Sequence, residues 1–259
     1  MNRKLFSIIT PTLNCGRKIG ATIESVLAQD RDLFEFIVVD GGSTDDTLDV
    51  VGRHADGLRL VSERDEGVYA ALNKGIDMAR GKYLYFLGAG DLLKENVLAG
   101  VKDVLPDGEL NFVYGDVYYV SRGQHFAGEF GKSELRVRNI CHQAVFYERK
   151  IFELLGKYDP KYRLNADYVF NLKCFADPRI TRRYIGRVIA DYEGGGMSDS
   201  AEDAALKRDF PRLVRTHLGG WQYVLQKRDA LWLSLYLNKQ KLTKRLRRGS
   251  GSPQLGGAE

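Results

Sequence analysis

The sequence predicts an α/β protein with a Rossmann-like, mostly parallel central sheet flanked by helices, and with further helices towards the C-terminus. The first part of the chain alternates short apolar, β-branched runs with longer stretches whose apolar residues recur at helical spacing. This alternation is typical of parallel strands joined by crossover helices. Each apolar run also ends in small, polar or acidic residues, and parallel strand ends share the rim where ligands bind. The 259 residues are 44% hydrophobic, enough to bury a core.

The elements of the first half follow one another in a regular order. We expect strands at Leu5–Thr10, Glu35–Val39, Leu58–Ser62 and Tyr83–Leu87, and helices from about Lys18, after the loop Asp40–Asp46, over Val68–Arg80 and over Leu92–Leu105. Ser43 or Thr44 is expected to cap the second helix, and Asp45 and Asp46 suit its positive first turn. Gly81 ends the third helix.

The pattern changes after residue 110. We expect strands at Asn111–Val120, Gln124–Phe130 and Thr181–Asp191, helices at Lys150–Leu155 and Asp167–Ala176, and a helical composition over Glu202–Arg247. The glycines at 194–196 interrupt this order. The expected organisation is one domain of two halves, residues 1–110 and 111–200, then a helical, basic segment at 201–248 and a flexible or tag-like tail at 249–259.

Composition narrows the class of protein. The three cysteines, Cys15, Cys141 and Cys174, show neither metal-ligand spacing nor a disulfide framework, so a reducing, cytoplasmic compartment is expected. No signal peptide is apparent, and no apolar run approaches the ~20 residues that a membrane span needs. The net charge is +5, and its excess is concentrated late in the chain, at Lys239, Lys241, Lys244, Arg245, Arg247 and Arg248. This asymmetry favours an anionic surface as a partner.

Three aspartates are candidates for chemistry, and each has a structural alternative. Asp40 follows an apolar strand and is suited to accept a hydrogen bond from a nucleoside base or ribose. Asp91 also follows a strand and is suited to hold a divalent cation against a diphosphate. Asp167 is suited to act as a general base on an acceptor hydroxyl. A helix cap is the alternative interpretation of each carboxylate.

Two further features carry weaker signals. His142, in the triplet Cys141-His142-Gln143, is a candidate contact for phosphate or metal, with an ordinary hydrogen-bonded histidine as the alternative. The loop Gly194–Ser198 has the composition to wrap a diphosphate with its backbone N–H groups, or to be a plain turn.

An ordered series of segments resembles glycosyltransferase family 2. The segments are Ser7–Asn14 (SIITPTLN), Ile37–Thr47 (IVVDGGSTDDT), Asp65–Gly75 (DEGVYAALNKG), Gly81–Asp91 (GKYLYFLGAGD), Cys141–Phe146 (CHQAVF), Ala166–Tyr168 (ADY) and Gly195–Ser198 (GGMS). Cys141–Phe146 and Ala166–Tyr168 match the acceptor-side half of a bacterial subgroup, and Gly195–Ser198 matches its closing loop. The resemblance covers roughly residues 5 to 200.

The resemblance implies a GT-A fold and an inverting transfer from a nucleoside-diphosphate sugar, with UDP favoured over GDP or dTDP. By match, Asp167 is the catalytic base and Asp91 the metal carboxylate. The residues implied to bind the nucleotide sugar are Thr10, Pro11, Asn14, Asp40, Gly42, Asp65, Asn73, Lys74, Gly90, Asp91, His142 and Ser198. The implied cofactor is Mn²⁺ or Mg²⁺. Because the family's metal motif commonly holds two or three acidic residues and Gly88–Asp91 holds one, metal binding is expected to depend on the donor's phosphates.

The C-terminal region departs from processive members of the family. It lacks their multiple membrane spans and Gln-x-x-Arg-Trp motif, which favours transfer of a single sugar to a glycan, glycolipid or lipid-linked acceptor. Aromatic residues, among them Trp221 and Tyr223, are interleaved with Lys227, Arg228 and the late basic cluster. Such a helix either lies on an anionic membrane or packs on the core. The expected location is cytoplasmic, with peripheral attachment to the cytoplasmic face of the inner membrane as one form.

Other classes of function remain alternatives at this point. A nucleotidyltransferase would carry a glycine-rich, basic loop after the first strand, where this chain has Pro11–Gly16 (PTLNCG). A non-catalytic nucleotide-sugar or glycan-binding protein derived from a transferase is consistent with the reduced motif at Asp91. No nucleic-acid recognition motif accompanies the basic tail, so nucleic acid is not an expected partner.

Overall fold

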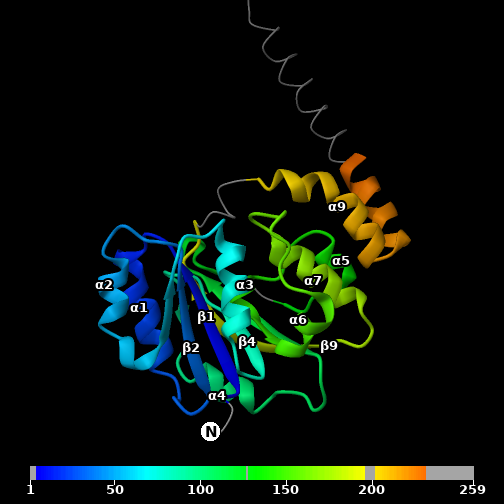
Figure 1. Ribbon diagram of the computed structural model, residues 1–259. Helices are drawn as coiled ribbons and strands as arrows, with labels where there is room; N and C mark the ends of the chain where they lie inside the picture. The colour runs from blue at the N-terminus through cyan, green and yellow to red at the C-terminus, as the bar shows by residue number, and fades with distance from the viewer. Residues whose placement is uncertain (1–3, 127, 196–201, 232–259) are drawn as a thin grey trace, which may run out of the picture.

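The computed structural model describes residues 4–126, 128–195 and 202–231. These residues form a nine-stranded sheet with helices packed around it (Figure 1). The strands are β1 (Phe6–Thr12), β2 (Phe34–Asp40), β3 (Arg59–Ser62), β4 (Tyr83–Phe86), β5 (Leu92–Leu93), β6 (Asn111–Tyr119), β7 (Gln124–Phe126), β8 (Val145–Glu148) and β9 (Thr181–Tyr192). The helices are α1 (Gly16–Leu27), α2 (Thr47–Gly52), α3 (Val68–Met78), α4 (Val97–Lys102), α5 (Lys132–Leu135), α6 (Arg149–Leu155), α7 (Ala166–Ala176) and α9 (Ala204–His217), followed by helical residues 220–231.

The sheet has the strand order β3-β2-β1-β4-β8-β6-β9-β5, with β7 paired to β6. The β3-β2-β1-β4 part is parallel, as the alternating pattern predicts. From β8 onwards parallel and antiparallel pairs mix: β8 runs antiparallel to β4 and β6, whereas β6 and β9 are parallel. In the parallel part, short apolar runs are buried on both faces because crossover helices cover them, as for Ile8, Ile9 and Val38, which are wholly buried.

The helices pack as the apolar patterns require. The first helix turns Ile19, Ile23 and Val26 into the core, and α3 packs across β1 and β2. On the other side of the molecule α6, α7 and α9 lie together, with α9 above α7 in the view of Figure 1. Within the described residues, no helix is both long and apolar enough to span a membrane.

Two predictions about individual elements, one in each half of the chain, are wrong. The stretch Leu92–Leu105 is not one helix: Leu92 and Leu93 form β5, paired with Asp191 and Ala190 of β9, and α4 covers only Val97–Lys102. An edge strand of two residues leaves no periodicity in the sequence, and its partner lies almost a hundred positions away. The strand predicted at Gln124–Phe130 is likewise shorter, because pairing with β6 ends at Phe126.

The predicted cap of the second helix is also wrong. Helix α2 begins at Thr47, and Asp46 at its N-cap position makes no side-chain capping bond. Ser43 instead turns its hydroxyl back to Asp40, and Asp45 accepts the backbone N–H of Thr47 at 3.0 Å. Of the helical stretch predicted at Glu202–Arg247, residues 204–217 and 220–231 are helical, and residues after 231 lie outside the described part of the chain.

Candidate functional site

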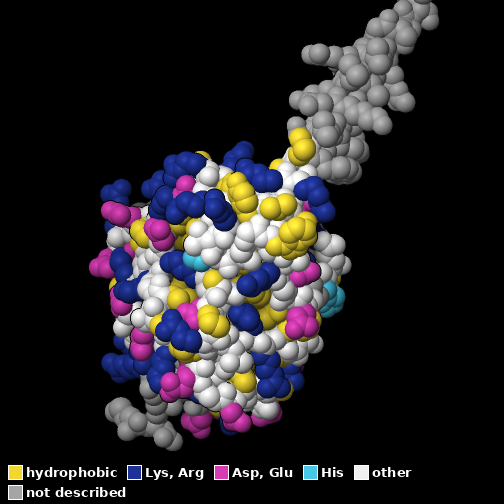
Figure 2. Space-filling view, turned by 90° about the vertical axis from the view of Figure 1, so that its right-hand side faces the viewer, with side chains coloured by type: hydrophobic (Ala, Val, Ile, Leu, Met, Phe, Trp, Pro, Cys, Tyr) yellow, Lys and Arg dark blue, Asp and Glu magenta, His cyan; other side chains and the backbone are white. Residues whose placement is uncertain are grey.

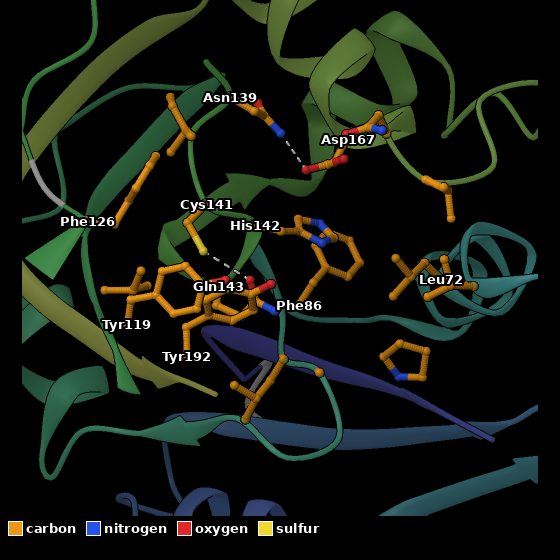
Figure 3. Close-up of a pocket in the computed structure, with 18 of the residues that line it drawn as sticks. Leu72, Phe86, Tyr119, Phe126, Asn139, Cys141, His142, Gln143, Asp167 and Tyr192 are labelled. Carbon is orange, nitrogen blue, oxygen red and sulfur yellow. Dashed lines mark hydrogen bonds between the residues drawn. The ribbon is translucent and has the colours of Figure 1, made fainter. Parts of the chain in front are cut away.

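A cleft of about 370 Å³ lies at the carboxyl ends of β1, β4, β6 and β9 (Figure 3). Its position follows from the topology, because parallel strand ends meet on one rim. The lining residues come from both halves of the chain: Pro11, Val68, Tyr69, Leu72, Phe86, Leu87, Gly88, Val117, Tyr119, Arg122, Phe126, Asn139, Ile140, Cys141, His142, Gln143, Leu164, Asn165, Asp167 and Tyr192.

Asp167 forms one wall of this cleft. It lies in the first turn of α7, where the backbone N–H groups favour a negative charge. The Tyr69 hydroxyl donates to Oδ1 at 2.6 Å, and the Asn139 side-chain amide donates to Oδ2 at 2.7 Å (Figure 3). The side chain is therefore almost fully buried yet oriented, in the manner of a carboxylate prepared to accept a proton from a bound hydroxyl.

Asp91 does not line the cleft itself; it lies in the loop after β4, against Gln143 and Gly88, which do. The Gln143 amide donates to Oδ2 at 2.7 Å, and the backbone N–H of Glu193 donates to Oδ1 at 2.9 Å. Burial raises the pKa of Asp91 to about 6, against the opposing effect of these hydrogen bonds. A carboxyl group that lies next to a cleft, and whose burial disfavours its charged form, is typical of a functional site.

Glu193 is a site residue that the sequence did not reveal. It follows β9, and its carboxylate pairs with Lys18 of α1 at 2.7 Å. Gly90 is in the left-handed region at φ +113°, and a Cβ there would come within 2.6 Å of Glu193 Oε2. The loop Gly88–Asp91 thus needs Gly90 so that a carboxylate from β9 can approach it. In the sequence, the local feature that could have pointed to Glu193 is the run of glycines that follows it.

The residues around Asp91 fit a divalent cation in part. Asp91 and Glu193 offer oxygen donors, which Mg²⁺ and Mn²⁺ prefer. In the part of the chain that the structure describes, no three His, Cys, Asp or Glu side chains group as a metal site.

His142 lies in the cleft wall, and its ring already contacts other side chains of the protein. Its Nε2 lies 2.9 Å from the Tyr158 hydroxyl, and the ring stacks on Phe86 with a centroid distance of 4.9 Å. Burial lowers the pKa of His142, which keeps it neutral. These contacts correspond to the ordinary hydrogen-bonded histidine that was the alternative to a metal ligand.

A second group of predicted residues surrounds the ends of β1, β2 and β3. Asp40 is wholly buried; burial alone would raise its pKa, but hydrogen bonds from Ser43 and Ser62 hold the pKa below its ordinary value. Asp40 also accepts the backbone N–H groups of Gly42 and Ser43, both at 3.0 Å. Its carboxylate therefore shapes the loop after β2, and Gly42 turns that loop at φ +86°.

The remaining members of this group tie neighbouring loops together. Asn14, at φ +52°, accepts the backbone N–H of Thr44 at 2.9 Å. Lys74 pairs with Glu63 at 2.8 Å and with Asp65. The group lies beside the cleft, and Pro11 is its link to the cleft lining.

Two further predicted residues, Thr10 and Asn73, do not line the cleft. Thr10 is wholly buried within β1, so its neighbour Pro11 lines the cleft instead. The amide of Asn73 accepts from the backbone N–H of Tyr158 at 3.1 Å and donates to its carbonyl at 2.9 Å, which uses both ends of the side chain. Ser198 lies outside the described residues.

Aromatic and basic residues that sequence reasoning missed line the side of the cleft away from α3. Tyr119 and Tyr192 lie with ring centroids 4.8 Å apart, and Phe126 lies on the same side (Figure 3). The Arg122 guanidinium lies 4.3 Å from the centre of the Tyr119 ring. These residues lie at the ends of β6, β7 and β9, whose adjacency depends on long-range pairing.

Comparison with known proteins agrees with this geometry. The sequence profile of the family described as "Glycosyl transferase family 2" matches residues 7–157. The chain is 42% identical over 223 residues to a "PGL/p-HBAD biosynthesis glycosyltransferase" of Mycobacterium tuberculosis (strain ATCC 25177 / H37Ra), covering 83% of this chain and 87% of the relative. It is 27% identical over 161 residues to the poly(ribitol-phosphate) beta-N-acetylglucosaminyltransferase TarP of Staphylococcus aureus (strain N315), covering 60% of this chain and 49% of TarP.

Solved structures share the fold at low sequence identity. S. aureus TarS 1–349 in complex with UDP-GlcNAc superposes with a TM-score of 0.65 at 18% identity, over 82% of this chain and 66% of that one. The chain spans 39% of a longer TarS chain. The mannosyltransferase PcManGT from Pyrobaculum calidifontis, in complex with GDP-Man and Mn²⁺, gives 0.61 at 18% identity, over 94% and 84%. The predicted GT-A fold is therefore confirmed. From the family profile and the mycobacterial relative together, the chain belongs to glycosyl transferase family 2 and is a glycosyltransferase.

Proposed function

We propose that this enzyme transfers a single sugar, with inversion, from a nucleoside-diphosphate sugar to a hydroxyl of a glycan, glycolipid or lipid-linked acceptor. The observation that carries the proposal is the placement of Asp167 and Asp91. One oriented carboxylate, Asp167, lines the cleft, and the other, Asp91, is held by Gln143 of the cleft lining. This is the separation of tasks that a single displacement needs, with a base at the acceptor and a stabilised leaving group at the donor.

The proposed reaction needs one carboxylate on the acceptor. Asp167 takes the proton of the acceptor hydroxyl as its oxygen bonds to the anomeric carbon. The bond from that carbon to the diphosphate oxygen breaks, and the diphosphate leaves with the electron pair. Tyr69 and Asn139 hold Asp167 in position throughout, because both of its oxygens are fixed by their hydrogen bonds.

The donor's diphosphate is proposed to lie by Asp91, Glu193 and Lys18. Asp91 and Glu193 would hold Mn²⁺ or Mg²⁺, which when bound offsets the charge of the departing diphosphate. Lys18, released from Glu193, would add a positive charge at the same place. Residues 1–110 are proposed as the nucleotide-sugar half and residues 111–200 as the acceptor half. UDP is the favoured nucleotide, with GDP and dTDP as the other candidates, since a relative binds UDP-GlcNAc and another GDP-Man.

The place of action is proposed to be the cytoplasm, with attachment to the cytoplasmic face of the membrane where lipid-linked acceptors lie. The support is the concentration of basic residues late in the chain.

Calorimetric titration with UDP, GDP and dTDP, with and without Mn²⁺, tests the donor side. One nucleotide is expected to bind more tightly with Mn²⁺, and this gain is expected to be lost in Asp91→Ala. A folded protein that binds none of the three would sink the nucleotide-sugar proposal and favour a glycan-binding role. Binding without any effect of Mn²⁺ would remove the metal from the proposal.

A further inference from the structure

In the helical residues 220–231, polar side chains make the ion pair and hydrogen bonds to the body of the protein, and large apolar side chains are exposed. Arg136, whose side chain is only 10% exposed, pairs with Asp229 at 2.6 Å and donates to the Gln222 side chain at 3.1 Å. Gln222 also donates to Ser133 at 3.3 Å. Polar side chains thus make the hydrogen bonds and the ion pair between this helix and the body, while Tyr223 packs against the core as a partly buried side chain.

The opposite face of the same helix is apolar and basic. Trp221 is 71% exposed, Val224 53% and Leu231 63%. Lys227 and Arg228 are exposed beside them. At helical spacing these five residues share one side, away from Gln222 and Asp229. We call them the outer face of helix 220–231.

A further exposed apolar side chain lies near the helix. Val137, next in sequence to Arg136, is 68% exposed and lines the same hollow as Gln226, which at helical spacing lies on the side of Gln222 and not on the outer face. Figure 2 shows hydrophobic side chains gathered below the start of the grey tail, with Lys and Arg side chains beside them. Exposed apolar side chains that are grouped in this way mark a surface that contacts another phase or partner.

The charges on the outer face indicate the kind of partner that it binds. The outer face holds the two cations Lys227 and Arg228 and no acid; Arg228 also pairs at 3.0 Å with Asp229, which Arg136 holds from the other side. The sequence after Asp229 has no Asp or Glu before Glu259, and it holds six Lys or Arg between residues 239 and 248. Cations that flank Trp and aliphatic side chains match an anionic bilayer, where aromatic rings lie at headgroup depth and cations meet lipid phosphates.

We propose that the outer face of helix 220–231 is a membrane-docking surface that binds anionic lipid and inserts Trp221, Val224 and Leu231 into the interface. Arg136 is the positioning residue, because its bonds to Gln222 and Asp229 prevent the helix from turning its apolar side inward. The inference extends the proposed membrane location of the enzyme, and its test measures lipid binding, which is independent of sugar transfer.

Tryptophan fluorescence with vesicles tests the surface directly. The chain has two tryptophans, so Trp232→Phe leaves Trp221 as the single reporter. With phosphatidylcholine vesicles that contain phosphatidylglycerol, Trp221 emission is expected to shift to the blue and to be quenched by bromine-labelled lipid. Pure phosphatidylcholine should have a smaller effect, and added salt should weaken the response. Emission that is unchanged by anionic vesicles would overturn the proposal.

Matched variants locate the contact in a vesicle sedimentation assay. The triple variant Trp221→Gln, Val224→Gln, Leu231→Gln is expected to bind anionic vesicles about tenfold more weakly or worse. Leu60→Gln, which alters a 40% exposed apolar side chain on β3, is expected to bind as the parent does. Nucleotide titration of the triple variant checks that the body is folded. Equal vesicle binding by parent and triple variant contradicts the proposal, as does a parent that self-associates through this face instead of binding vesicles.

Discussion

At the scale of single residues, Asp167 is the side chain on which the proposed chemistry depends most. Asp167→Asn keeps the size of the side chain and removes the base, so kcat is expected to fall by about 10²–10⁴-fold. Nucleotide affinity should not change, because in the proposed arrangement Asp167 contacts the acceptor hydroxyl and not the nucleotide. Steady-state transfer rates and nucleotide titration measure the two effects.

The control for this prediction is Tyr69→Phe, which removes one hydrogen bond to Asp167 and leaves the carboxylate in place. It is expected to lower kcat far less than Asp167→Asn does. An Asp167→Asn enzyme with unaltered kcat would show that another group takes the proton.

The raised pKa of Asp91 predicts that the stability of the protein depends on pH. Its pKa is about 6 in the folded protein and is expected near 3.8 when unfolded, so the folded state binds more protons between these values. Stability of the ligand-free protein contributed by this group therefore falls as pH rises from about 4 to 6, by about 3 kcal/mol in all.

The matched variant is Asp91→Asn, which cannot ionise. In the absence of nucleotide it is expected to be more stable than the parent at pH 8, by on the order of 1–3 kcal/mol, and to have no such advantage near pH 4. Denaturant unfolding at both pH values checks this. The same gain at pH 4 and pH 8 would mean that the charge of Asp91 is not its source.

Site residues could be predicted from the sequence only where the residue itself stands in a recognisable motif. Asp167 and Asp91 follow strand or loop motifs and were predicted in this way. Glu193 was not, because its role depends on the approach of β9 to Gly90. Thr10 shows the opposite error, since a motif position next to Pro11 points into the core rather than the cleft.

At the scale of elements, the contact of α3 with β1 predicts an unequal response to two glycine substitutions. A Cβ at Gly75 would lie 2.4 Å from Ile9 Cγ2, and Ile9 is wholly buried. Gly75→Ala is therefore expected to push α3 from the sheet and to cost about 1–3 kcal/mol of stability. Chemical denaturation measures the change.

The control is Gly52→Ala, at the exposed end of α2, where a Cβ meets nothing within 4 Å. It is expected to be neutral or stabilising by up to about 1 kcal/mol, because alanine loses less conformational entropy in a helix. Equal effects of the two substitutions would contradict the close packing of α3 on β1.

Elements could be predicted where local sequence determines them. The four parallel strands and α7 were found because their apolar runs need no knowledge of their neighbours. The edge strand β5 was mistaken for part of a helix, since Leu92 and Leu93 are extended only by pairing with β9.

At the scale of the whole molecule, the cleft depends on a helix that does not line it. Asp203 caps α9 by accepting the backbone N–H groups of Ala205 and Leu206, both at 3.1 Å. Its other oxygen accepts the N–H of Leu164 at 2.9 Å, and Leu164 lines the cleft three positions before Asp167. This hydrogen bond could not be predicted from the sequence, because it joins segments about forty residues apart.

Asp203→Ala is therefore expected to affect stability and catalysis together. Loss of the cap should cost about 1–2 kcal/mol, and the freed Leu164 loop should lower kcat of the fully folded enzyme because Asp167 is less well held. Thermal unfolding and transfer rates measured well below the midpoint separate the two effects. Glu202→Ala is the control, since Glu202 forms an exposed pair with Lys207 at 2.7 Å and should change neither quantity much. If Asp203→Ala lowers stability while the folded enzyme keeps its full kcat, α9 supports the fold without positioning the catalytic loop.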